Sequence, residues 1–384
     1  MYKVHSHLKK GPHRAAAAMF GTMVGAGIFA LPHAIAKSGV PIGIFWMLVL
    51  GSAALLLHLI FGEIVLKTPG QHRLVGYCRI YLGRWAGDIQ ALASILGLIG
   101  GSLAYLILGG LFMRELAMPF AEIPADVFSS VLFLVGAVTV WKGANFLARI
   151  DFWLSLGLAG VLILIAAKSF VHLEPANLST VDMAHVFTPY GLVLFAFGGL
   201  SAVTEMKDII GRHDPSALRK SIAYGTLAAI ALTALFAVST VGALGSATTP
   251  ESVAGLANRF GGFVPILGAA AGFLAVITSY IVFSLFLKEQ FRFDFKWSHG
   301  ISWAVSVGAP FLLFLLGIRS FGRVLEVIGG VLGGITGIFV CLAYLKVRKK
   351  YAEDVLRPPL ALIYLLITVF FGGALYELIF RTLN

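Results

Sequence analysis

Charged residues are scarce in this chain. Only 12% of its 384 residues are Asp, Glu, Lys or Arg, whereas 59% are hydrophobic, and the mean hydropathy is +0.91. A soluble protein of this size could not cover so much apolar surface with so few charges. The composition therefore excludes a soluble globular protein and indicates a polytopic, all-α membrane protein.

Cysteine is nearly absent as well. The chain has only Cys78, in a predicted loop, and Cys341, in a predicted span, which excludes a disulfide framework and a cysteine-based metal site. The sequence also lacks a G-x-x-x-x-G-K-[ST] phosphate-binding loop, so an ATP-driven pump is unsupported. Gly21, Gly25 and Gly27 imitate a dinucleotide fingerprint, but they lie inside an apolar span without a βαβ context. We therefore expect no enzyme, and no cofactor other than the coupling Na⁺ considered below.

Long apolar stretches recur to the end of the chain. The hydropathy pattern predicts about eleven membrane spans of roughly 17 to 25 residues. Their predicted limits are 14–36, 41–66, 88–113, 126–141, 151–169, 185–204, 219–243, 264–287, 300–317, 322–345 and 358–380. Short helices are predicted within 67–87, at the membrane interface, and around 251–259. We expect a single transmembrane domain over residues 1–384, embedded in the lipid bilayer of a bacterial or archaeal plasma membrane.

The net charge of +11 follows the predicted topology. With a cytoplasmic N-terminus, 22 of the 29 Lys and Arg residues fall on inside segments and only seven on outside segments. This asymmetry predicts an inside N-terminus and an outside C-terminus. The basic excess is thus an orientation signal, and we expect no nucleic-acid partner. The segment 34–36 imitates a signal-peptidase site, but the long, interrupted apolar run predicts no cleavage.

Two predicted spans carry glycines at mid-membrane. Span one contains Gly25-Ala26-Gly27 followed by Pro32, and span six contains Gly198-Gly199 beside Phe195 and Phe197. Glycine and proline weaken a helix, and each unpaired backbone group in lipid costs several kcal/mol. The two interruptions lie five spans apart. A repeat unit of five spans crosses the membrane an odd number of times, so its second copy would have the opposite orientation in the membrane. Interrupted helices at matching positions of inverted halves indicate a secondary-transporter binding site.

Helix packing is the alternative explanation for these glycines. Small residues let helices approach closely, and Gly21 with Gly25 forms a G-x-x-x-G packing motif. The same motif recurs, where packing alone explains it, at Gly97/Gly101 and Gly329/Gly333. The matched placement of the interruptions in spans one and six favours a binding site there.

The residues around both interruptions resemble a known family. The stretch 21–32, GTMVGAGIFALP, is similar to the first-helix signature of the amino acid/auxin permease family and its bacterial aromatic amino acid permease relatives. Residues 195–199, FAFGG, with Glu205 resemble the sixth helix of the same group. The motif residues within 62–83 resemble the second-helix end and following loop of the wider amino acid–polyamine–organocation superfamily. The resemblance implies a leucine-transporter-type fold, with inverted five-helix repeats over about 14–169 and 185–345 and an eleventh helix over 358–380.

Backbone groups at the two interruptions suit an amino acid zwitterion. The carboxylate would lie at the start of the outer half-helix, on the N–H groups of Gly25, Ala26, Gly27 and Ile28. The ammonium group would bind the carbonyls of Met23, Phe195 and Ala196.

Side chains around the interruptions would shape the rest of the pocket. Phe195 or Phe197 would close over the substrate, and Gly198 and Gly199 leave room for a bulky neutral or aromatic side chain. On span three, polar contacts or packing alone are open alternatives for Ser102 and Tyr105.

Span eight carries the residues of a candidate cation site. The pattern Ala275-x-x-Thr278-Ser279 resembles the sodium site of the sodium-coupled leucine transporter group. The resemblance implies oxygen ligands, which suit a hard cation, from Gly21, Val24, Ala275, Thr278 and Ser279. Alternatively, both hydroxyls bond back to carbonyls of their own helix. The chain departs from the pattern at Gly21, where sodium-coupled relatives often have Asn.

Ionisable residues within the spans offer proton coupling instead. His58 and Glu63 on span two lie five residues apart and therefore on different faces, and Glu63 is either a proton carrier or a structural partner of a basic residue. Glu205 would pair with Arg14 or a neighbouring base in a cytoplasmic gate. Two further carboxylates near the outer ends, Glu326 and Glu377, are expected to be solvated.

The sequence thus predicts a secondary active amino acid symporter that works by alternating access. An amino acid sensor of the same fold is the main alternative, although its long soluble extensions are missing here. A channel is disfavoured because no ring of pore-lining charges or carbonyls is evident. The pattern leaves the particular amino acid, the coupling ion and the oligomeric state open.

Overall fold

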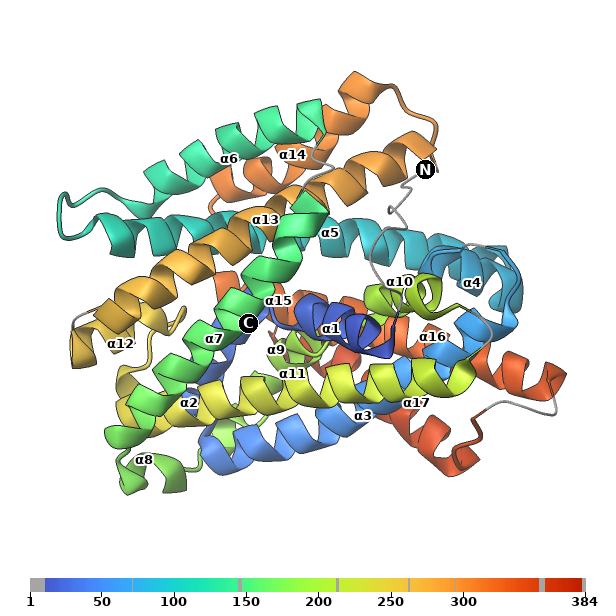
Figure 1. Ribbon diagram of the computed structural model, residues 1–384, viewed down its shortest axis with the longest axis horizontal. Coiled ribbons are helices and arrows are strands. Elements are labelled where there is room, and N and C mark those ends of the chain that lie inside the picture. Colours follow the sequence, from blue (N-terminus) through green and yellow to red (C-terminus); the bar gives the residue numbers. More distant parts are fainter. Residues whose placement is uncertain are drawn as a thin grey trace.

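The computed structural model describes residues 11–381, apart from 71, 144–146, 212–213, 262, 294 and 352–355, and these described residues form helices and connecting turns. Most of the long helices run side by side along the longest axis of the molecule (Figure 1). Short helices gather at the two ends, with α4 at one end and α8 and α12 at the other (Figure 1). The arrangement is a helical bundle with short helices at both ends.

Eight helical stretches among the described residues are long and apolar enough to cross a membrane alone. They fall on the predicted spans, with ends that differ by a few residues. They comprise α3 (Val40–Lys67), α5 (Arg84–Ala117), α6 (Ala125–Lys142), α7 (Leu147–Val171), α11 (Pro215–Leu244), α13 (Phe263–Phe293), the run of α15 (Phe321–Val327), η4 (Ile328–Gly333) and α16 (Gly334–Lys350), and α17 (Leu360–Tyr376).

The remaining apolar segments are interrupted or shorter. In predicted span one, α1 (Pro12–Met23) is followed by the 3₁₀ turn η1 (Ala26–Ala30) and by α2 (Leu31–Ser38), with a bend of 46° between the two halves. Predicted span six is divided into α9 (Thr188–Ala196) and α10 (Leu200–Ile210). Predicted span nine is α14 (His299–Leu315), an apolar helix with Pro310 in its interior.

Short helices connect the long ones at both ends of the bundle. The two that the sequence predicts are present as α4 (Leu74–Leu82) and α12 (Val253–Phe260). The others are α8 (Pro175–Ser179), η2 (Met183–His185), η3 (Gly245–Ala247) and η5 (Glu377–Arg381).

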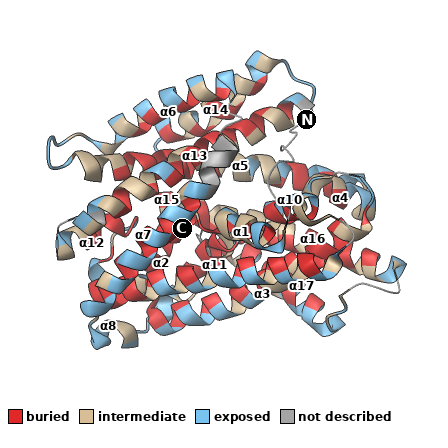
Figure 2. Cartoon of the chain, in the orientation of Figure 1, coloured by how far each residue is buried: buried red, intermediate tan, exposed pale blue. Residues whose placement is uncertain are grey.

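The interrupted helices lie in the interior of the bundle. Helix α1 packs against α7, α10 and α11, while α9 packs against α2, α3 and η4. Buried residues follow the inward faces of the helices, whereas α6 and α14 at one edge carry many exposed residues (Figure 2). Large apolar side chains such as Leu134, Val138 and Leu315 are exposed on that edge, as expected for helices that face lipid. The fold therefore encloses the two interruptions within a shell of continuous helices.

Candidate substrate-binding site

The interruption of span one is a local change in backbone hydrogen bonding. The Val24 N–H donates to the Phe20 carbonyl at 2.8 Å and closes α1. The next N–H, that of Gly25, donates to the Met23 carbonyl at 3.1 Å, and Val24 between them has φ −82° and ψ 85°, the geometry of an inverse γ-turn. The Ile28 N–H then donates to the Gly25 carbonyl at 3.2 Å as η1 begins. The predicted break at Gly25–Gly27 is confirmed.

The interruption of span six has a similar form. The Phe197 N–H donates to the Val193 carbonyl at 2.9 Å, and the Gly198 N–H donates to the Phe195 carbonyl at 3.1 Å. Gly199 then precedes the first turn of α10, and its carbonyl accepts from the Ala202 N–H. The predicted break at Gly198–Gly199 is confirmed, and Gly198 itself is exposed.

The two interruptions touch one another. The Phe195 ring lies so close to Gly27 that a Cβ at Gly27 would be 2.8 Å from Phe195 Cδ1 and 3.6 Å from the Ala196 Cα. On the other side, a Cβ at Gly199 would be 2.7 Å from Met19 Cε and 3.2 Å from His58 Cε1. The distances of 2.7 and 2.8 Å are shorter than ordinary carbon–carbon contacts, so a side chain at Gly27 would displace the Phe195 ring and one at Gly199 would displace the end of the Met19 side chain. The fold thus brings Gly27 of span one against Phe195 and Ala196 of span six, three of the residues that the sequence assigns to the pocket.

The two phenylalanines of span six have different surroundings. Phe195 is half-buried beside Gly27. We call the place where Gly27 of span one meets Phe195 of span six the junction. Phe197 is buried and lies against α3, where its ring is 3.5 Å from the position of a Cβ at Gly51. Only Phe195 is therefore placed where a ring could cover the junction. The side chain of Ala26, a predicted contact, lies outside the described residues.

The two predicted polar residues of span three are buried in α5. Tyr105 packs edge-on against Phe283 of α13, with ring centroids 5.1 Å apart. The Ser102 hydroxyl is fully buried and has no hydrogen-bond partner within the described part of the chain. The two alternatives for Ser102 and Tyr105, polar contact or packing alone, stay open.

The candidate cation ligands are found on α1 and α13. The Thr278 hydroxyl donates to carbonyls of its own helix, at 3.0 Å to Ala275 and 3.2 Å to Leu274, which is the alternative pattern expected for such residues. The Gly21 carbonyl accepts from the Ser155 hydroxyl of α7 at 3.5 Å. Sequence reasoning missed Ser155, although it is a small polar residue within an apolar span. Within the described residues, no cluster of three His, Cys, Asp or Glu side chains suits a metal ion.

Glu63 has a structural partner on α11. Its carboxylate is fully buried and accepts from Arg219 Nε at 2.6 Å and from Arg219 Nη2 at 3.2 Å. Of the two interpretations of Glu63, this bidentate ion pair favours the partner of a basic residue. His58 reaches the same helix, where its Nδ1 lies 3.2 Å from the Thr226 hydroxyl. Both side chains thus contact α11, but through separate partners, Arg219 for Glu63 and Thr226 for His58.

The predicted gate residues lie on neighbouring helices. Arg14 on α1 and Glu205 on α10 are both exposed, and the two helices pack against one another. Their pairing stays a prediction.

The expectation that Glu326 and Glu377 are solvated was wrong. Both side chains are buried. The backbone of Glu326 lies against Gly191 of α9, and the Glu377 side chain packs beside Gly330 of η4. Close packing at Gly330 covers the Glu377 side chain, and sequence spacing from the span ends does not reveal the burial of either carboxylate.

The junction is closed on the side of α12. The Ser252 hydroxyl donates to the Phe29 carbonyl at 2.8 Å, and His33 Nδ1 lies 2.7 Å from the Thr248 carbonyl. Phe29 packs edge-on against both Phe112 and Phe236. The loop between α11 and α12 therefore seals the η1–α2 half of span one.

On the other side of the junction, where α1 and α10 lie, several residues are exposed. Thr22 on α1 is exposed, as are Gly198 and Ser201 at the start of α10. Two cavities, of about 440 and 250 Å³, lie elsewhere, at the ends of the bundle. Exposed residues therefore lie on the α10 side of the junction, whereas the loop between α11 and α12 covers its other side.

Two interrupted helices that meet inside a helical membrane bundle are typical of membrane transport proteins, and the family match places the chain in a transporter class that is not an enzyme. The chain belongs to the tryptophan/tyrosine permease family, which it matches over residues 13–377. The predicted resemblance to amino acid permeases is thus confirmed, although the family that matches is this one and not the amino acid/auxin permeases. The chain is 25% identical over 291 residues to the tryptophan-specific transport protein of Shigella flexneri, covering 70% of this chain and 67% of that protein.

Solved structures share the fold. The structure of MhsT in complex with L-phenylalanine superposes with a TM-score of 0.69 and 15% identity, over 97% of this chain and 98% of that one. The Eremococcus coleocola manganese transporter, in complex with an aromatic bis-isothiourea substituted compound, gives a TM-score of 0.66 and 11% identity, over 98% and 90%. Both neighbours have the leucine-transporter fold.

Proposed function

We propose that this chain is a symporter that carries neutral amino acids, aromatic ones above all, by alternating access. The contact between Phe195 and Gly27 carries the proposal, because it joins the two helix interruptions, where the backbone is irregular, into one site. The family, the tryptophan-specific relative and the phenylalanine-bound neighbour support an aromatic amino acid as the substrate.

The proposed topology places eleven spans in two inverted five-helix repeats followed by a last helix. The distribution of Lys and Arg supports a cytoplasmic N-terminus. In this orientation the α12 side is outside and the α10 side is inside. The sealed outer half and exposed inner half then correspond to an inward-facing conformation.

Binding of the zwitterion would replace hydrogen bonds that the backbone now makes within the interruption of span one. The N–H groups of Gly25 and Ile28 donate to nearby carbonyls in this structure. A substrate carboxylate would replace those carbonyls as the acceptor, with the dipole of the outer half-helix adding to the attraction. The ammonium group would lie against the Met23, Phe195 and Ala196 carbonyls, and Phe195 would cover the bound side chain.

Two coupling ions are consistent with these residues. Sodium would bind between α1 and α13, on carbonyls of Gly21, Val24 and Ala275 and on the Thr278 and Ser279 hydroxyls. A proton would instead be carried by His58, which is buried directly behind Gly199. Glu63 is better explained as the partner of Arg219.

Uptake by purified protein in liposomes tests the proposal. A panel of labelled amino acids is offered while sodium and proton gradients are imposed separately. We expect gradient-driven accumulation of at least one aromatic amino acid. No gradient-driven uptake of any amino acid would contradict transport and favour a sensor. Uptake that follows pH alone, and is unchanged in Thr278→Ala and Ser279→Ala, would exclude the sodium site.

A further inference from the structure

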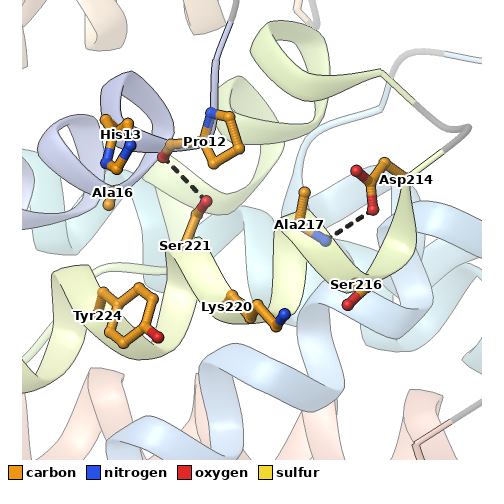
Figure 3. A pocket seen from close by; sticks show the side chains of 9 residues that line it. All are labelled: Pro12, His13, Ala16, Asp214, Ser216, Ala217, Lys220, Ser221 and Tyr224. Atoms are coloured by element: carbon orange, nitrogen blue, oxygen red, sulfur yellow. Dashed lines mark hydrogen bonds between the residues drawn. The ribbon is translucent and has the colours of Figure 1, made fainter.

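A cavity of about 440 Å³ lies at the inner ends of α1 and α11, away from the substrate site. Residues from the two helices line it, as Figure 3 shows. They are Pro12, His13, Ala16, Asp214, Ser216, Ala217, Lys220, Ser221 and Tyr224. We propose that this cavity binds the headgroup of a phospholipid that bears a primary ammonium group, of the phosphatidylethanolamine class.

The charges around the cavity match such a headgroup. Lys220 and His13 are exposed side chains without an ion pair within the described part of the chain, and they suit a phosphate. Asp214 is also exposed and lies at the start of α11, where one carboxylate oxygen accepts from the Ala217 N–H at 2.8 Å. Figure 3 shows Asp214 at one end of the cavity and His13 at the other, with Lys220 between them. A headgroup with an anionic phosphate and a nearby ammonium group can place the phosphate by Lys220 and His13 and the ammonium group by Asp214. A purely anionic headgroup would be repelled by the Asp214 carboxylate.

The surface next to the cavity suits an acyl chain. Exposed residues of α11 continue from Lys220 at helical spacing and form a stripe of Tyr224, Leu227, Ala228, Ala231 and Leu235. Tyr224 is 68% exposed and Leu227 50%. Residues three and four apart lie on one face of a helix, so the stripe leads from the cavity toward the membrane centre. A Tyr at the boundary between a charged and an apolar surface is typical of the lipid interface.

The location places the cavity in the inner leaflet, and this step rests on the proposed orientation. The cavity is held together by the Ser221 hydroxyl, which donates to the Pro12 carbonyl at 2.9 Å and ties α1 to α11. Because α1 carries the inner half of the interrupted span, a bound lipid would contact the helix that lines the substrate junction.

Native mass spectrometry of the full chain tests lipid binding without measuring transport. The purified protein is equilibrated with phosphatidylethanolamine, phosphatidylglycerol and phosphatidylcholine of identical acyl chains. We expect retention of phosphatidylethanolamine over phosphatidylcholine by roughly tenfold, because the trimethylated ammonium of phosphatidylcholine cannot donate a hydrogen bond to Asp214.

Variants assign the headgroup contacts. Lys220→Gln should weaken phosphatidylethanolamine retention roughly tenfold, with recovery in Lys220→Arg. Asp214→Asn keeps a side chain that caps the helix and should reduce the preference for phosphatidylethanolamine over phosphatidylcholine to about one. Lys346→Gln, an exposed lysine at the end of α16, is the matched control and should bind as the unmodified chain does.

Three results would overturn the inference. The first is equal lipid selectivity in the unmodified chain and in both folded variants, Lys220→Gln and Asp214→Asn. The second is a loss of phosphatidylethanolamine retention in Lys346→Gln equal to that in Lys220→Gln. The third is full displacement of the lipid by water-soluble glycerophosphoethanolamine, which would show a free phosphate site with no part played by the acyl stripe.

Discussion

Single residues set the geometry of the junction, and Gly27 is the one packed against the Phe195 ring. A methyl group there would meet the Phe195 ring at 2.8 Å. The ring would have to move, and overpacking of this kind costs roughly 1–3 kcal/mol.

We therefore expect Gly27→Ala to lower the ratio kcat/KM for uptake by about tenfold or more. Part of the loss should return in Gly27→Ala/Phe195→Leu, because a smaller side chain makes room for the methyl group. The control is Gly308→Ala on α14, where a Cβ meets nothing within 4 Å. Undiminished uptake in Gly27→Ala would show that the contact does not shape the site.

The ion pair between Glu63 and Arg219 is a second prediction at the residue scale. Glu63 is fully buried, so removing the charge of Arg219 leaves an uncompensated carboxylate. Arg219→Gln should lower the free energy of unfolding by about 3 kcal/mol, measured by thermal unfolding in detergent. Replacing both residues, as Glu63→Leu/Arg219→Met, should restore most of that stability.

Asp88→Asn is the matched control for this prediction. It removes one partner of Arg79, in a pair whose side chains are both about half exposed, and should cost less than about 1 kcal/mol. Equal losses in Arg219→Gln and Asp88→Asn would contradict a special role for the buried pair.

At the scale of elements, the loop between α11 and α12 acts on the η1–α2 half of span one. Ser252 has a positive φ of 67° and donates to the Phe29 carbonyl. Ser252→Gly suits that backbone and removes the CH₂OH side chain, and with it the hydrogen bond to the Phe29 carbonyl. A net hydrogen bond is worth about 1 kcal/mol.

We expect Ser252→Gly to raise the population of outward-open molecules about fivefold. The readout is labelling of a cysteine introduced at Ala30, which is buried beneath this seal, by a membrane-impermeant reagent added outside. Ser246→Gly, on the exposed side of the same connection, should leave the labelling rate unchanged. No change in Ser252→Gly would show that other contacts hold the seal.

At the scale of the whole molecule, the proposed conformation is inward-facing, closed on the α12 side and open on the α10 side. Cysteines introduced at Thr22 and Ser201, which are exposed, should react with impermeant reagents in inside-out vesicles and not in right-side-out vesicles. The native thiols should contribute little background, because both are buried and burial raises the pKa of the Cys78 thiol to about 12. Faster labelling from the outside would contradict the inward-facing assignment.

The sequence by itself determined the membrane class, the placement of most spans and the positions of both interruptions. These follow from local properties, since apolar length and the weak helix propensity of glycine act wherever the residues stand. The breaks at Gly25–Gly27 and Gly198–Gly199 are examples.

Only the tertiary structure decided which residues meet. It placed Phe195 on Gly27 and turned Phe197 toward α3, brought Ser155 to the Gly21 carbonyl, and buried Glu326 and Glu377. The physical reason is that these contacts join segments far apart in the chain, and hydropathy cannot distinguish a helix face that meets lipid from one that meets another helix. The apolar pattern therefore predicts where the spans lie, whereas close packing between helices decides which residues form the candidate site.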